Sequence, residues 1–324
     1  MTEPAAAPAS TEAPWRRAVG LVVVLVVISF GILALRGSWS DARAALERLS
    51  VVDLVASAVP GAAALWLMYV AWRSFLTAVG ATLPTRDARR MFFTTQLGKY
   101  VPGSVWPVLL QVEVAKRNGV PRVKILAGYA LAFGGGIISG AVVGLLVLDG
   151  PATGWVPITA LVGGLAGILL AGMLLDGRAF GVLGARLGRR PEGRIGRFAG
   201  FDFSRLDRGA TLRAVVAIFG AWGALGLHAW LLARPLGASA TDLPFVMGSF
   251  AFAWIAGMVA IPVPAGAGVR EVVLVLTVGE LLGRPEATVI ALASRLLLLL
   301  LELGAGALAG APRAWRGLRT TVGR

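Results

Sequence analysis

The chain has 324 residues, of which 57% are hydrophobic and only 15% are charged, and its formal net charge is +14. A water-soluble domain of this length carries many more charges, so the composition excludes that class and indicates an all-α membrane protein that crosses the bilayer several times. Because the basic residues cluster between apolar runs, the positive-inside rule and anionic lipid explain them without nucleic acid. With no cysteine and one histidine, His228, disulfides and cysteine- or histidine-rich metal sites are excluded.

The first part of the chain predicts a tail, two spans and a short surface helix. Residues 1–14 are rich in Ala, Pro and Thr, and we expect a disordered tail. The apolar run 19–35 predicts an uncleaved first span, and a cleaved signal peptide is the competing interpretation. Residues 38–50 mix charges with leucines, which predicts a short helix outside the membrane. Residues 51–79 predict the second span.

The apolar pattern then breaks at residues 96–107, which read QLGKYVPGSVWP. A helix does not pass cleanly through Pro102-Gly103, because proline lacks the backbone donor and restricts the residue before it. In lipid, a broken backbone persists only where protein or a water-filled cavity covers it. The stretch is therefore either a loop at the membrane edge or a re-entrant segment that builds a site.

Two further spans are predicted in the middle of the chain, at residues 125–148 and 155–175. Within the first, Gly136, Gly140 and Gly144 recur every four residues, which predicts close packing against another helix.

The longest polar segment, residues 176–213, carries nine arginines: Arg178, Arg186, Arg189, Arg190, Arg194, Arg197, Arg205, Arg208 and Arg213. It fits either an amphipathic helix on an anionic leaflet or a solvated cytoplasmic loop.

A second break interrupts the last third of the chain, at residues 261–271, which read IPVPAGAGVRE. Apolar segments at 212–233 and 243–261 precede it, and segments at 269–282 and 287–309 follow it. Residues 15–312 thus form one transmembrane domain, followed by a basic tail at residues 313–324.

The apolar runs predict about six to eight transmembrane helices, and the distribution of arginine predicts that both termini lie in the cytoplasm. This orientation requires the first break to enter and leave from the cytoplasmic side. Residues 243–261 and 269–282 either both cross the membrane or both dip in from outside as half-spans. The second alternative gives an inverted repeat with two re-entrant segments, as in many transporters. The abundance of Ala, Gly and Arg, with few Lys, suggests a bacterial source.

Charged residues inside spans are costly and are candidates for function. Arg270 and Arg295, with Lys99, could hold an anion such as a lipid phosphate, or Arg270–Glu271 and Arg295–Glu302 could be structural ion pairs. Lys99 could also reach the interface, and His228 is interpreted as a packing residue. The candidate lipid- or anion-binding residues are Lys99, Tyr100, Pro102, Gly103, Trp106, Glu113, Pro264, Gly266, Gly268, Arg270, Glu271, Arg295 and Glu302.

Common enzyme motifs are missing from the sequence: it has no Gly-Lys-Ser/Thr phosphate loop, no paired-histidine metal motif and no Gly-x-Ser-x-Gly elbow. We therefore predict no catalytic residues, cofactor or metal, and expect a protein that is not an enzyme.

The two breaks resemble one known family, the lysylphosphatidylglycerol synthase transmembrane region family, also called flippase-like domain proteins. The resemblance rests on residues 98–106, GKYVPGSVW, the basic AKRNGV at 115–120, PVPAGAGVRE at 262–271, and Arg295. It implies a multi-span inner-membrane domain, which in its best-known members moves a modified phospholipid and is fused to a cytosolic aminoacyl transferase. This chain has no room for the transferase, so we do not expect lysyl transfer.

Three functions follow as hypotheses. The first is a translocase that binds an anionic phospholipid or a polyprenyl-linked lipid without nucleotide hydrolysis. The second is an accessory or transferase subunit of envelope glycolipid synthesis, with Glu113 or Glu271 as the catalytic carboxylate. The third is a scaffold for a soluble partner on the arginine-rich segment. A homo-oligomer or an envelope-synthesis partner is compatible with each of them.

Overall fold

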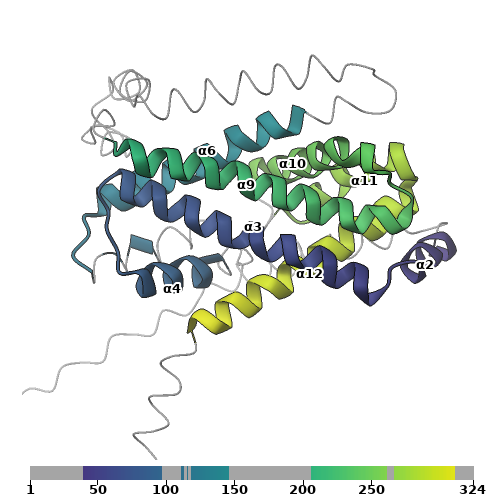
Figure 1. Ribbon diagram of the computed structural model, residues 1–324, viewed down its shortest axis with the longest axis horizontal. Coiled ribbons are helices and arrows are strands. Elements are labelled where there is room, and N and C mark those ends of the chain that lie inside the picture. The colour runs from purple at the N-terminus through teal and green to yellow at the C-terminus, as the bar shows by residue number, and fades with distance from the viewer. Residues whose placement is uncertain are drawn as a thin grey trace, which may run out of the picture.

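The computed structural model describes residues 39–96, 111–112, 115, 118–145, 206–260 and 266–310, and their regular structure is entirely helical (Figure 1). The α-helices are α2 (Trp39–Glu47), α3 (Val51–Ala78), α4 (Thr85–Gln96), α6 (Arg122–Gly144), α9 (Arg208–Ala233), α10 (Leu243–Val259), α11 (Val269–Leu282) and α12 (Arg284–Gly310). Two short 3-10 helices, η5 (Arg234–Leu236) and η6 (Ala240–Asp242), connect α9 to α10.

Within this part of the chain, five segments are long and apolar enough to cross a membrane, which confirms a multi-pass helical membrane protein. They are Val51–Ala78, Arg122–Gly144, Arg208–Leu236, Ala240–Val259 and Arg284–Ala309. The spans predicted at 19–35 and 155–175 lie outside the described residues. So do the tails at 1–14 and 313–324 and most of the arginine-rich segment, except that α9 already begins at Arg208.

The helices α3 and α9 lie side by side in opposite directions along the length of the molecule, and α12 crosses obliquely (Figure 1). At one end, Arg48 Nη2 donates to Pro235 O at 3.0 Å. At the other end, Asp207 N–H donates to Ala78 O at 3.1 Å. The start of α3 is capped reciprocally, because Ser50 Oγ accepts from Asp53 N–H and the Asp53 carboxylate accepts from Ser50 N–H. These contacts fix both ends of the antiparallel pair.

The predicted glycine face of α6 packs against α9 and α10. A Cβ atom on Gly140 would lie 2.4 Å from Trp222 Cζ2 of α9, and one on Gly144 would lie 3.5 Å from the Phe252 backbone of α10. Only glycine permits helices to approach so closely. The prediction of close packing from the glycine repeat is therefore confirmed.

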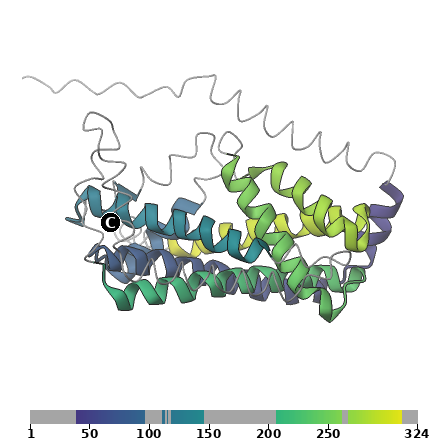
Figure 2. The same ribbon diagram turned by 90° about the horizontal axis from the view of Figure 1, so that it is seen from above.

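The helices α10 and α11 form a hairpin that occupies one half of the length of the bundle (Figures 1 and 2). Its open end lies at the α2 end of the molecule, where a Cβ on Gly237, just before α10, would be 3.7 Å from Leu282 Cδ2 at the end of α11. Its tip lies beside the middle of α12, where Arg270 contacts Ser294. With 14 residues, α11 is about 21 Å long, which is shorter than the hydrocarbon core of about 30 Å.

At the opposite end of the bundle, α4 packs against α3 and α12 and leads into the first break. The rings of Phe92 and Phe93 pack on Tyr69 at centroid distances of 5.7 and 5.6 Å. After the break, Gln111 Oε1 accepts from Trp72 Nε1 at 3.1 Å. The chain therefore leaves and returns beside the same part of α3. Except for Gln96, the break itself (96–107) lies outside the described residues.

Candidate functional site

Six of the thirteen candidate residues lie in the described part of the chain, and five of these meet around the tip of the α10–α11 hairpin. The six are Gly266, Gly268, Arg270, Glu271, Arg295 and Glu302. The candidates outside the described residues are Lys99, Tyr100, Pro102, Gly103, Trp106, Glu113 and Pro264.

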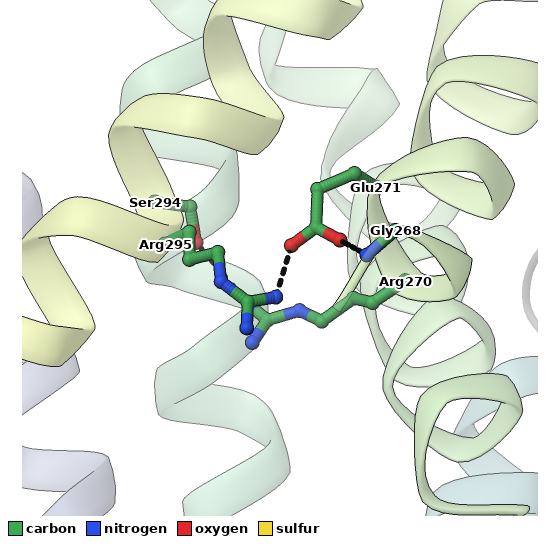
Figure 3. Close-up of polar contacts among 5 residues, drawn as sticks. All are labelled: Gly268, Arg270, Glu271, Ser294 and Arg295. Atoms are coloured by element: carbon green, nitrogen blue, oxygen red, sulfur yellow. Dashed lines mark hydrogen bonds and ion pairs between the residues drawn. The ribbon is translucent and has the colours of Figure 1, made fainter. Parts of the chain in front are cut away.

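Glu271 links the tip of the hairpin to α12 (Figure 3). Its Oε2 accepts from the backbone N–H of Gly268 at 2.6 Å, and its Oε1 accepts from Arg295 Nη1. Glu271 is the third residue of α11, so this carboxylate also caps the start of the helix. Both carboxylate oxygens are engaged and the residue is only 7% exposed. The pair therefore holds α11 against α12 and fixes the guanidinium of Arg295.

Arg270, which directly precedes Glu271 in α11, packs against two aromatic rings of α10. Its Cζ lies 4.6 Å from the centroid of Phe250 and 4.1 Å from that of Trp254. Arg270 Nη2 also donates to Ser294 Oγ at 3.4 Å, so Arg270 and Glu271 contact adjacent residues of α12, Ser294 and Arg295. Cation–π contacts of this kind stabilise a guanidinium away from water. The arrangement brings two arginines to one level of the bundle.

The turn at the tip depends on glycine at two positions. Gly266 and Gly268 have φ angles of +62° and +85°, which other residues rarely adopt. In addition, a Cβ on Gly266 would lie 2.5 Å from the Cα of Gly257 on α10. The backbones of the two arms thus touch directly, which places Arg270 under the aromatic rings of α10.

His228 is buried among polar partners from two other helices, and Ser294 connects it to Arg270. Its Nδ1 lies 2.9 Å from Ser57 O and 2.8 Å from Ser57 Oγ on α3, and its Nε2 lies 2.9 Å from Ser294 Oγ on α12. The sequence identified His228 as a packing residue, and the structure shows that the packing includes hydrogen bonds between three helices.

Phe250, Trp254 and Ser294 also belong to the site, although the sequence alone does not indicate them. The spacing of the two aromatic residues, four apart on one helix, is the signal that could have identified a platform for a cation. Glu302, the remaining candidate, is buried on α12 and is 5% exposed. No cluster of three acidic or histidine side chains suited to a metal ion occurs among the described residues.

A search of the curated proteins found no match. The family model of the lysylphosphatidylglycerol synthase TM region matches residues 17–306, which is most of the chain and includes both breaks and Arg295. The chain therefore belongs to the lysylphosphatidylglycerol synthase TM region family.

Proposed function

We propose that the chain binds the anionic headgroup of a membrane lipid at the tip of the α10–α11 hairpin and moves the lipid between the leaflets. The observation that carries the proposal is the meeting of Arg270, Glu271 and Arg295 halfway along an apolar bundle. Charges at such a depth are costly and mark substrate pathways in membrane proteins.

The depth of the site follows from the helix geometry. Arg295 comes eleven residues after Arg284, the first of the 27 residues of α12, so it lies about 16 Å along a helix of about 40 Å. The trio brings two guanidinium groups to one level of the bundle, which is the chemistry that suits an anionic headgroup. Guanidinium groups bind phosphate through paired hydrogen bonds, and Arg270 is already oriented by Phe250 and Trp254.

The outer surface of α12 offers a place for the acyl chains. Leu292, Leu296 and Leu300 are exposed and recur every four residues, so they form one apolar stripe beside Arg295. A lipid could then place its headgroup against the arginines while its tails remain in the bilayer. With the tails in the bilayer, the protein needs no passage wide enough to admit the whole lipid.

The proposed membrane placement makes α10–α11 a re-entrant hairpin that opens to the outside. Among the described residues, eight basic side chains and two acidic ones gather at the α4 end: Arg73, Arg86, Arg89, Arg90, Arg122, Lys124, Arg208 and Arg213 against Asp87 and Asp207. The α2 end has four basic side chains and six acidic ones: Arg43, Arg48, Arg234 and Arg284 against Asp41, Glu47, Asp53, Asp242, Glu280 and Glu286. The positive-inside rule favours the α4 end as cytoplasmic. The hairpin and the first break then enter from opposite sides, as in an inverted repeat.

The geometry of Glu271 does not favour it as the catalytic carboxylate of a transferase, and Glu113, the other candidate, lies outside the described residues. A catalytic carboxylate needs an oxygen that can reach a substrate proton, but both oxygens of Glu271 are bonded to Gly268 and Arg295. Glu271 is therefore better suited to fix an arginine than to act as a base.

A liposome assay tests the proposal. The full chain is reconstituted with phosphatidylglycerol that carries a fluorophore on its headgroup or acyl chain, and the fraction that moves to the inner leaflet is measured by chemical bleaching from outside. R270A and R295A should each slow movement about tenfold or more, because each removes charge-assisted hydrogen bonds to phosphate. The matched control is R43A, which breaks the exposed Arg43–Glu47 ion pair of α2 and should leave the rate unchanged. A labelled polyprenyl phosphate in a parallel arm distinguishes the two lipid classes. Equal rates in protein-free liposomes and in liposomes with the wild type, for both lipids, would contradict the proposal.

A further inference from the structure

His228 lies at the centre of a hydrogen-bond network that connects the proposed headgroup site to α3. The network extends from Arg270 Nη2 through Ser294 Oγ to His228 Nε2, and from His228 Nδ1 to Ser57 O. His228, Ser57 and Ser294 are each 0% exposed. The proposed binding of lipid by Arg270 does not by itself require a histidine here.

The bonding partners determine where the protons lie. Ser57 O is a carbonyl and only accepts, so His228 Nδ1 carries the hydrogen and donates it. The Ser57 hydroxyl donates to His228 O at 3.1 Å. Arg270 only donates, so Ser294 Oγ accepts from Arg270 and gives its own hydrogen to His228 Nε2. In this neutral tautomer, Nε2 holds the one lone pair of the ring that can take up a proton.

The charged groups near the ring come from three of the helices that pack around it. On α3 the neighbour is Ser57, and Asp53 lies one turn away, bonded to Ser50. On α10 it is Phe250, whose ring centroid lies 6.0 Å from that of His228. The neighbours on α11 and α12 are Arg270, Glu271, Ser294 and Arg295. The sequence of α10 contains no titratable side chain. Among the described residues, the guanidinium of Arg270 is joined to His228 Nε2 through one intervening atom, Ser294 Oγ.

We propose that His228 is a proton-binding site coupled to the headgroup site, so that binding of an anionic lipid is accompanied by uptake of a proton at Nε2. The proton comes from water and is returned to water when the lipid leaves. On protonation, Nε2–H donates to Ser294 Oγ, and the Ser294 hydroxyl hydrogen turns away. This inference rests on the proposed function of the same site.

The direction of the coupling follows from the charges. In the empty site, a proton on His228 places a second positive charge next to Arg270, which opposes protonation. A bound phosphate offsets that repulsion, so the occupied site holds the proton more tightly. Coupling between two ligands is reciprocal, so headgroup binding must strengthen as the pH falls, and the range from about pH 5 to 8 is the one to compare.

Calorimetry on the full chain in detergent tests the coupling. Short-chain phosphatidylglycerol is the probe, because its phosphodiester stays ionised throughout this range. Repeating the titration in buffers with different ionisation enthalpies gives the number of protons taken up per lipid. We expect an uptake of a fraction of one proton per lipid, and an affinity about fivefold or more higher at pH 5 than at pH 8, since couplings of this size are common.

Two variants and one control make the test specific. H228N should abolish proton uptake and flatten the affinity–pH profile. S294A keeps the histidine but removes the link to Arg270, and should reduce both effects even if H228N does not fold. The control is S249A, because the Ser249 hydroxyl is buried with no hydrogen-bond partner among the described residues and its removal should leave proton uptake as in the wild type.

Binding without proton uptake in the wild type, or an unchanged pH profile in H228N or S294A, overturns the coupling and leaves the proposed function intact. If the pH dependence of the affinity persists in H228N but disappears in E302Q, the proton binds to Glu302, which also overturns the proposed coupling to His228. Absence of both lipid binding and lipid movement at every pH overturns the proposed function and the coupling together.

Discussion

Glu271 and Arg295 form an ion pair between α11 and α12 at the level where the α10–α11 hairpin turns. The side chains are only 9% and 22% exposed, so each charge is balanced by the opposite charge of its partner rather than by water. The same carboxylate caps the start of α11 through Gly268. One residue thus fixes the turn of the hairpin, its attachment to α12 and the position of an arginine in the proposed site.

The first prediction concerns the stability of this pair. E271A should lower the free energy of unfolding by about 3 kcal/mol or more, because it leaves a partly buried guanidinium without its partner. The double variant E271A/R295A should lose less than the sum of the two single losses, by about 1 kcal/mol or more. Unfolding in detergent measures both quantities. Strict additivity would show that the two side chains do not interact.

The second prediction concerns the glycine face of α6. G140A should destabilise the protein by about 1–3 kcal/mol, because the new methyl group would overlap Trp222. G134A on the same helix is the matched control, since a Cβ there meets nothing within 4 Å among the described residues. It should be neutral or stabilising by up to about 1 kcal/mol, as alanine favours helix more than glycine. Thermal unfolding in detergent distinguishes the two outcomes, and equal effects would contradict the packing argument.

A third prediction separates backbone strain from close contact at the hairpin tip. G119A and G266A both place alanine at a positive φ, +70° and +62°, which costs about 1–2 kcal/mol. Only at Gly266 does the new Cβ also meet the backbone of Gly257, at 2.5 Å. G266A should therefore be clearly the more destabilising variant and should also reduce lipid movement. Similar losses in unfolding free energy for both would show that the contact with α10 has no energetic role.

The fourth prediction concerns the aromatic platform under Arg270. W254L removes the ring that lies 4.1 Å from the guanidinium carbon, and should slow lipid movement about two- to thirtyfold, because a cation–π contact contributes about 0.5–2 kcal/mol. W66L is the control, as Trp66 is an exposed tryptophan of α3 remote from the hairpin in sequence. The liposome assay compares the two rates. Equal slowing in both would contradict a specific role for Trp254.

The apolar pattern predicted the long helices well, because the thickness of the bilayer constrains their length. The span expected at residues 51–79 is α3 (Val51–Ala78), and the segment expected at 269–282 is α11 with the same limits. The predicted short surface helix is α2. Helix α4 was missed although Ala88, Met91, Phe92 and Thr95 form a buried face at helical spacing. Its twelve residues are too few, and too rich in arginine, to stand out beside long apolar runs.

The candidate site was only partly accessible from the sequence. The cost of burying charge identified Arg270, Glu271 and Arg295, and this rule needs no knowledge of the fold. The choice of partners did require the fold, because Glu271 lies next to Arg270 in the sequence but bonds Arg295 on another helix. Phe250 and Trp254 lie in an apolar run in which aromatic residues look like ordinary lipid-facing or packing residues. Ser294 joins Arg270 to His228 only because α9, α11 and α12 meet at one level.

The direct contact between Gly257 and Gly266 limits how the protein can change shape. Gly266 lies in the turn before α11, and its contact with Gly257 leaves no space for that turn to shift along α10. We therefore expect α10 and α11 to move together. We then expect the site to open at the interface between α11 and α12. The polar contacts there are those of Glu271 with Arg295 and of Arg270 with Ser294. A cysteine pair that bridges the two arms should leave transport intact, whereas a pair that bridges α11 to α12 should stop it.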